Sequence, residues 1–221
     1  MYKKGYIYKG LKPVYWCTDC ETALAEAEIE YKDINSHTAY VKFPVKDSKG
    51  KFDKENTSIV IWTTTPWTLP GNMGITVGPE YKYSIVDIGK EKVIIATELV
   101  KTVMEKAEIE NYTTLAELEG KELEGVICRH PFLDRDSRVV LGSDDTIVVE
   151  LDAGTGAVHT APGYGKEDYL CGLKNGLDIV VTVNDKGHQT EEAGPFSGMY
   201  YAKSDKEIIK WLDENGYLLV A

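Results

Sequence analysis

The chain is short of basic residues and has no long apolar run, and each shortage excludes a class of protein. It has 25 lysines and arginines against 36 aspartates and glutamates, so its formal net charge is −11. Bulk electrostatics of this sign repels nucleic acid, so any nucleic-acid contact must be local or supported from outside this chain. The longest apolar runs, such as residues 59–62, fall far short of the roughly 18 residues of a membrane span.

Cysteine is also scarce. The four cysteines, two of them in Cys17-x-x-Cys20, are too few for a secreted disulfide framework, so reduced thiols are expected. The first residues lack the apolar stretch of a signal peptide, and we expect a cytoplasmic protein without membrane contact. A structural zinc site needs four ligands. The only further candidates are Cys128 and His130, so the sequence predicts neither a bound metal nor another cofactor.

What the chain does contain is enough for a folded core. Its 221 residues are 43% hydrophobic and 28% charged, which excludes disorder, collagen and coiled coil. Residues 1–40 differ from the rest, and we interpret them as a connecting segment that carries the cysteine pair. Within it, the alanines and leucine of residues 21–30 favour a helical turn or two. Residues 41–221 are then the core of the domain.

The core region has the pattern of a barrel or sandwich. Short β-rich runs are separated by glycine, proline, asparagine and aspartate. These predicted strands are residues 58–62, 75–77, 83–88, 93–97, 139–141, 146–149 and 179–183. A glycine-containing loop at 87–91 predicts a hairpin, and residues 184–187 predict a second turn.

Three helices are predicted between these strands, at residues 98–108, 166–174 and 205–215. For the last, Ser204 and Glu207 match a capping box, and Gly216 matches a left-handed stop. The helices do not alternate regularly with the strands, so βαβ units are not indicated. The predicted class is α+β, with a mostly antiparallel, barrel-like core and a few surrounding helices.

Two segments differ from ordinary core or surface. In residues 62–72, four threonines and Asn72 crowd the exit of a predicted strand, where two prolines prevent regular pairing. Their hydroxyls either face a cleft or satisfy their own backbone, and both interpretations stay open. In residues 152–169, four glycines allow close approach of a ligand to the backbone near His159 and Asp168. These two residues could equally be a hydrogen-bonded strand histidine and a carboxylate that stabilises a helix N-terminus by ~0.3–1 kcal/mol.

Known catalytic motifs do not assign a reaction to these segments. No serine lies in a nucleophile-elbow sequence, no HExxH is present, and neither a P-loop nor GxGxxG occurs. Residue types alone therefore indicate a cleft with threonine, histidine and aspartate, and nothing more specific.

The same segments closely resemble the editing (CP1) domain of bacterial-type isoleucyl-tRNA synthetase, an insertion in that enzyme's Rossmann catalytic domain. The matching motifs, which span nearly the whole chain, are residues 14–17 with 23–28, 62–72, 129–132 and 154–169. Valyl and leucyl relatives have another residue in place of Thr65 and lack the histidine at 159. Tyr164 departs from the family, which commonly has a second histidine there. The synthetic signatures His-x-Gly-His and Lys-Met-Ser-Lys-Ser are absent, so these residues would not activate an amino acid.

The resemblance implies hydrolysis of valine wrongly attached to tRNA(Ile), with valyl-adenylate as a second candidate substrate. One methylene is worth only about 1–3 kcal/mol in an apolar pocket, a limit for which isoleucyl-tRNA synthetase is itself the standard example, so a second site must destroy what the first admits. The implied partners are the valine-charged 3′ end of tRNA(Ile) and the remainder of the synthetase, and the domain is expected to be a monomer. Two alternatives stay open: a valyl- or leucyl-type editing domain, and a non-catalytic module that binds tRNA ends.

The resemblance also implies roles for individual residues. Asp168 would hold the substrate ammonium, and His159 with Trp62 would line a pocket that accepts valine and excludes isoleucine. Hydroxyl and backbone groups around the ester and the terminal adenosine would come from Thr63, Thr64, Thr65 and Thr68, with Asn72 orienting them. Of these, Asp168, Thr64 and Thr68 are the catalytic candidates, and the others are substrate-binding candidates. The attacking group would be a water molecule positioned by threonines and by a ribose hydroxyl of the tRNA, without metal.

Overall fold

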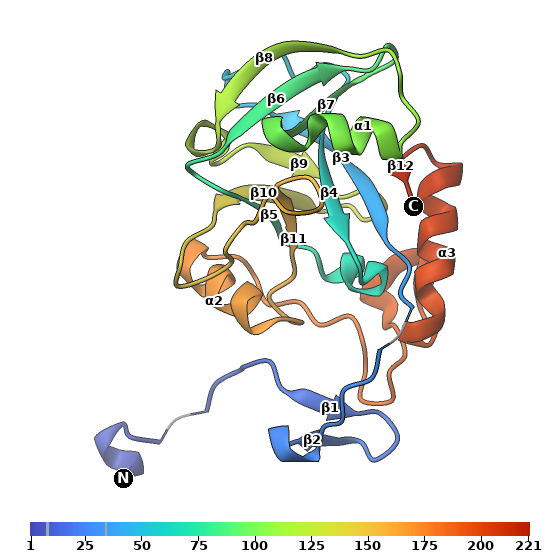
Figure 1. Ribbon diagram of the computed structural model, residues 1–221. Helices are drawn as coiled ribbons and strands as arrows, with labels where there is room; N and C mark the ends of the chain where they lie inside the picture. The colour runs from blue at the N-terminus through green and yellow to red at the C-terminus, as the bar shows by residue number, and fades with distance from the viewer. Residues whose placement is uncertain (8, 34) are drawn as a thin grey trace.

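The core of the protein is a closed β-barrel, seen in a computed structural model that describes residues 1–7, 9–33 and 35–221 (Figure 1). Its strands are β3 (Ala39–Asp47), β4 (Thr57–Thr63), β5 (Gly74–Val77), β9 (Ile127–Arg129), β10 (Asp136–Leu141) and β11 (Ala157–Thr160). They pair in the ring order β3, β4, β11, β5, β10, β9 and back to β3. Within the ring, β11 runs parallel to β4 and β10 runs parallel to β5, whereas the other pairs are antiparallel. The predicted class, α+β with a mostly antiparallel barrel, is confirmed.

Further strands extend the sheet beyond the barrel. β7 (Lys92–Ala96) pairs with the first half of β4, and β6 (Lys82–Asp87) and β8 (Thr113–Glu119) follow outward. On the other side, β12 (Leu218–Val220) pairs with β3. Because β4 has partners on both edges and is covered on both faces, Ile59, Val60 and Ile61 are all fully buried.

In the described part of the chain, three helices lie outside the barrel (Figure 1). They are α1 (Val100–Lys106), α2 (Lys166–Asn175) and α3 (Tyr201–Glu214). Short 3₁₀ turns are η1 (Tyr2–Lys4), η2 (Glu26–Glu28), η3 (Pro66–Gly71), η4 (Thr97–Leu99), η5 (Gly120–Leu123) and η6 (Glu191–Phe196). Figure 1 shows α3 along one side of the barrel and α2 near the end of β11. Across the described residues, no helix is both long and apolar enough to pass through a membrane.

Most strand predictions are confirmed, and two are wrong. The predicted hairpin at 87–91 joins β6 and β7 in antiparallel pairing. Residues 146–149 form no strand, although Ile147 and Val149 are buried while Val148 is 59% exposed. Their alternation reflects side chains inserted against the barrel, not backbone pairing. Residues 179–183 form only an isolated bridge between Val183 and Gln189.

The helix predictions hold in position but not in the details of their ends. Helix α3 begins at Tyr201, and Ser204 lies inside it, with its hydroxyl donating to the Tyr201 carbonyl at 2.7 Å. The predicted capping box is therefore wrong, because a tertiary hydrogen bond from Tyr201 N to Gly187 O fixes an earlier start. Gly216 does adopt the expected left-handed conformation, with φ 76°. Of the helical turn or two predicted for residues 21–30, one turn is present, η2. Residues Thr22–Leu24 form strand β2 instead.

The N-terminal segment forms a small hairpin beside the barrel. β1 (Tyr15–Cys17) pairs antiparallel with β2 (Thr22–Leu24), and Figure 1 shows this hairpin apart from the barrel. Trp16 Nε1 donates to the backbone carbonyl of Asp185 at 2.8 Å, so the hairpin contacts the turn at 184–187. That turn is confirmed, with Gly187 N donating to Asn184 O at 2.9 Å.

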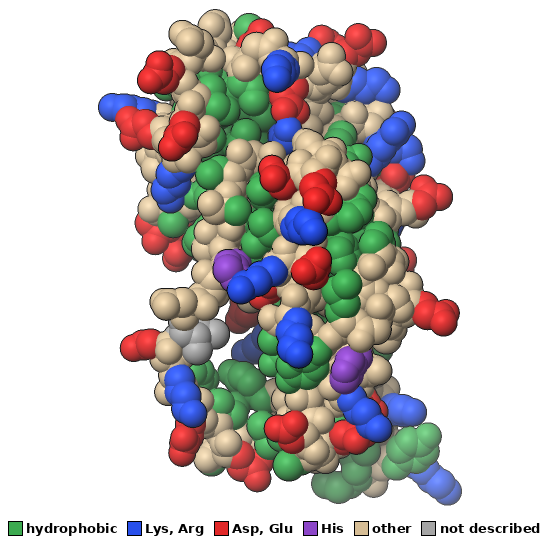
Figure 2. All heavy atoms as spheres, turned by 90° about the vertical axis from the view of Figure 1, so that its right-hand side faces the viewer, with side chains coloured by type: hydrophobic (Ala, Val, Ile, Leu, Met, Phe, Trp, Pro, Cys, Tyr) green, Lys and Arg blue, Asp and Glu red, His purple; other side chains and the backbone are tan. Residues whose placement is uncertain are grey.

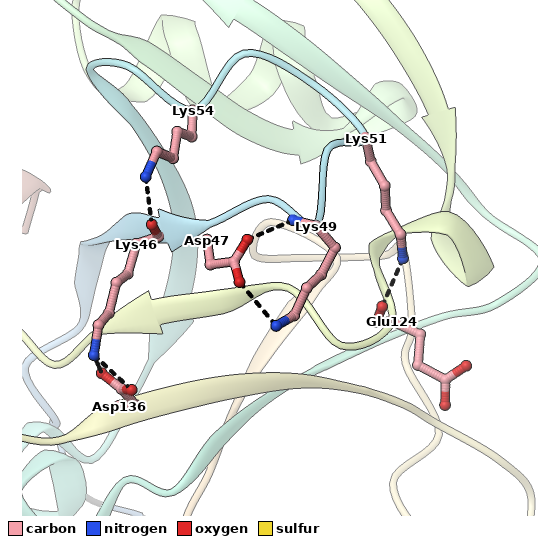
Figure 3. A network of polar contacts seen from close by, with 7 residues as sticks. All are labelled: Lys46, Asp47, Lys49, Lys51, Lys54, Glu124 and Asp136. Atoms are coloured by element: carbon pink, nitrogen blue, oxygen red, sulfur yellow. Dashed lines mark hydrogen bonds and ion pairs between the residues drawn. The ribbon is translucent and has the colours of Figure 1, made fainter.

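Surface charges are mixed rather than gathered by sign. On the face that carries α3, acidic and basic side chains are interspersed with apolar ones (Figure 2). Four lysines lie close together in sequence, Lys46 at the end of β3 and Lys49, Lys51 and Lys54 in the loop between β3 and β4. Figure 3 shows that they are engaged locally: Lys46 pairs with Asp136 at 2.7 Å, and Lys51 donates to the Glu124 carbonyl at 2.7 Å. Exposed pairs of this kind contribute little stability.

Candidate active site

A cavity of about 420 Å³ opens where the ends of β4 and β11 lie side by side. The two strands run parallel, with Val158 opposite Trp62, so the segments that follow them leave the barrel at one edge. This pairing brings together two parts of the chain about a hundred residues apart. The predicted site residues that line the cavity are Trp62, Thr63, Thr64, Thr65, Thr68, His159 and Asp168.

The threonines of the loop fall into two groups: some bind the loop's own backbone, and others are exposed at the cavity. Thr63 Oγ1 accepts from Thr65 N at 3.1 Å, and Thr68 Oγ1 donates to Thr65 O at 2.9 Å, so Thr63 and Thr68 fix the loop's own backbone. Thr64 and Thr65 are exposed at the cavity. Both interpretations of the sequence thus apply, each to different threonines. The turn is also held from outside, because Asp205 accepts a hydrogen bond from Trp67 N at 2.7 Å.

His159 forms part of the cavity wall and is held on both ring nitrogens. Its Nε2 lies 3.0 Å from Thr68 Oγ1, and its Nδ1 lies 2.8 Å from Asn72 Nδ2. Only 8% of the residue is exposed, and burial lowers its pKa to about 4, so the ring is neutral near pH 7. It is therefore a hydrogen-bonded strand histidine and a wall of the cavity at the same time.

Asn72 is the one predicted site residue that does not line the cavity. It is fully buried behind His159, and its amide is used by Gly74 O, His159 and Ser137. The structure therefore places Asn72 behind His159 rather than at the cavity surface, where a substrate-binding residue was expected. Nothing in the sequence marks Ser137, since a lone serine in a strand has no motif around it.

Asp168 stands in the first turn of α2 with its carboxylate at the cavity. Its Oδ1 accepts from Ala161 N at 2.8 Å, and a Cβ at Gly165 would clash with its Oδ2. Gly165 therefore provides the space that the carboxylate occupies. Burial raises the pKa of Asp168 above its ordinary value, and the Ala161 hydrogen bond opposes that shift.

The opposite wall comes from the loop before β11. Gly154 has φ 79°, and a Cβ there would lie 2.9 Å from Cε3 of Trp62, so this glycine lets the loop pass close to the indole. Val148, Glu150 and Asp152 also line the cavity. Asp152 lies in the segment 152–169 that the sequence singled out, whereas Val148 and Glu150 were not expected at a site, and Val148 lies in the run that was predicted to be a strand.

Tyr164 forms the rim of the cavity. Its ring meets Trp67 edge-on at 5.2 Å between centroids, and its hydroxyl lies 2.8 Å from Thr182 Oγ1. A Cβ on Gly71 would overlap this ring. Gly71 thus leaves room for the tyrosine ring at position 164, where the family commonly has histidine, and Thr182 holds its hydroxyl.

The cysteines and histidines do not come together as a metal site in the described part of the chain. Cys17 and Cys20 lie in the N-terminal hairpin, where Cys17 Sγ accepts from Cys20 N at 3.3 Å. Cys128 is fully buried in the barrel, and His130 Nε2 donates to Leu69 O at 2.8 Å. No cluster of three or more ligating residues occurs among the residues described.

Comparison with known proteins identifies the family of the chain. The family model of class I tRNA synthetases (I, L, M and V) matches residues 1–205. This chain belongs to the class I tRNA synthetases. The synthetase chain is 54% identical to the isoleucine–tRNA ligase of Natranaerobius thermophilus over 99% of its own length, and 52% identical to that of Moorella thermoacetica over 99%. In each case it spans only 23% of the relative's length.

Its fold is that of a synthetase editing domain. The editing domain of the cytosolic leucyl-tRNA synthetase of P. knowlesi superposes with a TM-score of 0.61, covering 82% of this chain and 94% of that domain at 11% identity. The resemblance to the editing segment of isoleucyl-tRNA synthetase is thus confirmed for family and fold. At 11% identity, the matching structure establishes the fold and not the reaction.

Proposed function

We propose that this synthetase segment hydrolyses valine from mischarged tRNA(Ile). The observation that carries the proposal is the cavity itself, which is lined by Asp168, by His159 and Trp62, and by a threonine-rich loop. A carboxylate binds the α-ammonium of an aminoacyl ester, and a fixed wall limits the size of its side chain. Valyl-adenylate, which has the same ammonium and side chain, is the second candidate substrate.

The cavity favours attack by water over covalent catalysis. No serine, cysteine or lysine is among the described residues that line it, and His159 is neutral and occupied on both nitrogens. In the proposed reaction, the water oxygen bonds to the ester carbon and the bond from that carbon to the ribose oxygen breaks. The leaving ribose oxygen takes the proton that water gives up. Exposed Thr64 and Thr65 and a ribose hydroxyl would position this water.

The surrounding charges support a divided role in binding RNA. The chain has a net charge of −11, and Lys46 and Lys51, at the end of β3 and in the loop that follows, already have local partners. We infer that the rest of the synthetase holds most of the tRNA and delivers the charged 3′ end. Residues 1–40 would be the connection to that larger enzyme, residues 41–221 the monomeric editing unit, and the location cytoplasmic.

The decisive experiment offers the chain valyl-tRNA(Ile) and isoleucyl-tRNA(Ile) and measures the release of each amino acid. We expect release of valine to be faster. Threonyl-tRNA(Val) tests the valyl-type alternative, since valyl enzymes confront threonine. Binding of charged tRNA without release of any amino acid would support a non-catalytic module and overturn the proposal.

A further inference from the structure

A chain of buried hydrogen bonds runs from the barrel wall to the cavity. The hydroxyl of Ser137, on β10, lies 2.7 Å from Oδ1 of Asn72. Nδ2 of Asn72 lies 2.9 Å from Gly74 O and 2.8 Å from Nδ1 of His159. Nε2 of His159 lies 3.0 Å from Oγ1 of Thr68, which lines the cavity. Ser137 and Asn72 are both fully buried, so neither touches a ligand in the cavity.

The donors and acceptors along this chain have one consistent assignment. A carbonyl oxygen only accepts, so the amide atom beside Gly74 O is the nitrogen, and Oδ1 of Asn72 accepts from Ser137. The second Nδ2 proton is directed at Nδ1 of His159, which must accept it. A neutral imidazole carries one proton, so that proton is on Nε2 and is donated to Thr68.

This tautomer decides what the hydroxyl of Thr68 can do. Because its oxygen accepts from His159, its own proton is not taken by the ring, and in the structure that proton is donated to Thr65 O at 2.9 Å. Donation to a ligand therefore requires the hydroxyl to turn from Thr65 O toward the cavity. With the opposite tautomer, Nε2 would be an acceptor and would take this proton. The Nε2–H form therefore leaves the Thr68 proton able to move from Thr65 O to an oxygen in the cavity, whereas the opposite tautomer would hold it at the ring.

We propose that Asn72 and Ser137 are positioning residues that hold His159 in its Nε2–H tautomer and so keep Thr68 a hydrogen-bond donor toward the bound substrate. The catalytic part rests on the proposed ester hydrolysis, in which negative charge develops on the carbonyl oxygen when water attacks. A prepositioned donor stabilises that charge, and losing one such donor costs about 10²–10³-fold in kcat. The hydrogen bond from His159 polarises the Thr68 hydroxyl and strengthens it as a donor.

The first test is the tautomer itself, read by nitrogen NMR of the chain labelled with ¹⁵N-histidine. His130 is an internal reference, because its Nε2 lies 2.8 Å from Leu69 O and its Nδ1 accepts from Leu133 N at 3.2 Å. We expect His159 to be protonated on Nε2, as His130 is. Protonation of His159 on Nδ1 would overturn the inference, whatever the activity of the chain.

Asn72→Asp tests the cause. A carboxyl has at most one proton and cannot donate both to Gly74 O and to Nδ1 of His159. We expect the His159 proton to move to Nδ1, the His130 signal to stay unchanged, and kcat for valine release to fall about 10²-fold or more with KM nearly unchanged. A variant that keeps Nε2–H, or that moves the proton and retains the parent kcat, contradicts the proposal.

Two further comparisons keep the test independent of how Asn72→Asp folds. Thr68→Val is isosteric and should lose about 10²-fold in kcat, whereas Thr68→Ser should retain most activity. Ser137→Ala should lower kcat about tenfold at constant KM, because the Asn72 carbonyl loses its donor. Its control is Ser84→Ala, since Ser84 is a buried strand serine that is bonded to Thr97 at 2.9 Å and is not among the residues that line the cavity.

The outcomes separate this inference from the proposed function. If the parent releases no valine but has Nε2–H on His159, the proposed hydrolysis and the donor role of Thr68 both fail, and the tautomer assignment stands. If the parent is active and Thr68→Val equals it, the donor role fails and the proposed hydrolysis stands.

Discussion

Asn72 lies directly behind His159, with 2.8 Å between Nδ2 of the asparagine and Nδ1 of the histidine. The second ring nitrogen is held by Thr68 at 3.0 Å. An imidazole fixed from both sides cannot turn away from a bulkier ligand, so it forms a rigid wall. This relationship underlies the first prediction, which concerns selectivity.

His159→Ala should let the site attack isoleucyl-tRNA(Ile). Exclusion by bulk rejects an extra methylene more strongly than any difference in affinity, and removing the ring removes the bulk. Valine release should slow, because Thr68 loses its support, while the ratio of isoleucine to valine release rises. The measurement is the release of each amino acid from charged tRNA(Ile). If both rates fall together at a constant ratio, His159 is structural only.

The same substitution should also lower stability. It leaves the buried amide of Asn72 without one partner, which costs about 1–3 kcal/mol in the free energy of unfolding. Urea denaturation monitored by circular dichroism measures this cost. It also shows that the variant used in the release assay is folded.

Asp168→Asn should abolish valine release while changing stability little. The substitution removes the charge that would hold the ammonium but keeps the size of the side chain. Glu167→Gln is the matched control, because Glu167 occupies the same first turn of α2 and does not line the cavity. Both variants remove a carboxylate worth about 0.3–1 kcal/mol at a helix N-terminus. Equal activity of the two variants would contradict the ammonium role.

Gly71 and Tyr164 should behave as a coupled pair. Gly71→Ala places a Cβ into the Tyr164 ring, so it should destabilise the chain by about 1–3 kcal/mol. In the background of Tyr164→His, which restores the residue common in the family, the same change should cost far less. A double-mutant cycle of unfolding free energies measures the coupling. Additive costs would show that the contact at the rim carries no energy.

Stability should fall as the pH drops below about 6.5. Burial lowers the pKa of His159 to about 4 and that of His130 to about 3, from an ordinary value of 6.5. The unfolded chain therefore takes up protons that the folded chain refuses, at a cost of up to about 1.4 kcal/mol per pH unit for each histidine. Denaturation between pH 6.5 and 5, above the ordinary carboxyl range, measures the slope. His159→Gln should reduce that slope, and an unchanged slope would contradict the assignment.

The sequence by itself determined the class of the fold and the segments that make the cavity. Alternating and continuous apolar runs predict strands such as β4 and β6, because burial of one or both faces imposes those patterns. The threonine loop and the glycine-rich segment stood out because prolines and glycines restrict or release the backbone locally. These patterns depend only on neighbouring residues, so they can be recognised in a single sequence.

Only the tertiary structure decided which side chains meet. The parallel pairing of β4 and β11 places Trp62 opposite Val158, and no local pattern specifies that register. The same barrel turns Asn72 inward to Ser137 and His159, starts α3 at Tyr201, and leaves 146–149 unpaired. Each result depends on hydrogen bonds between residues distant in sequence, whose partners are set by closure of the barrel and not by the propensity of either segment.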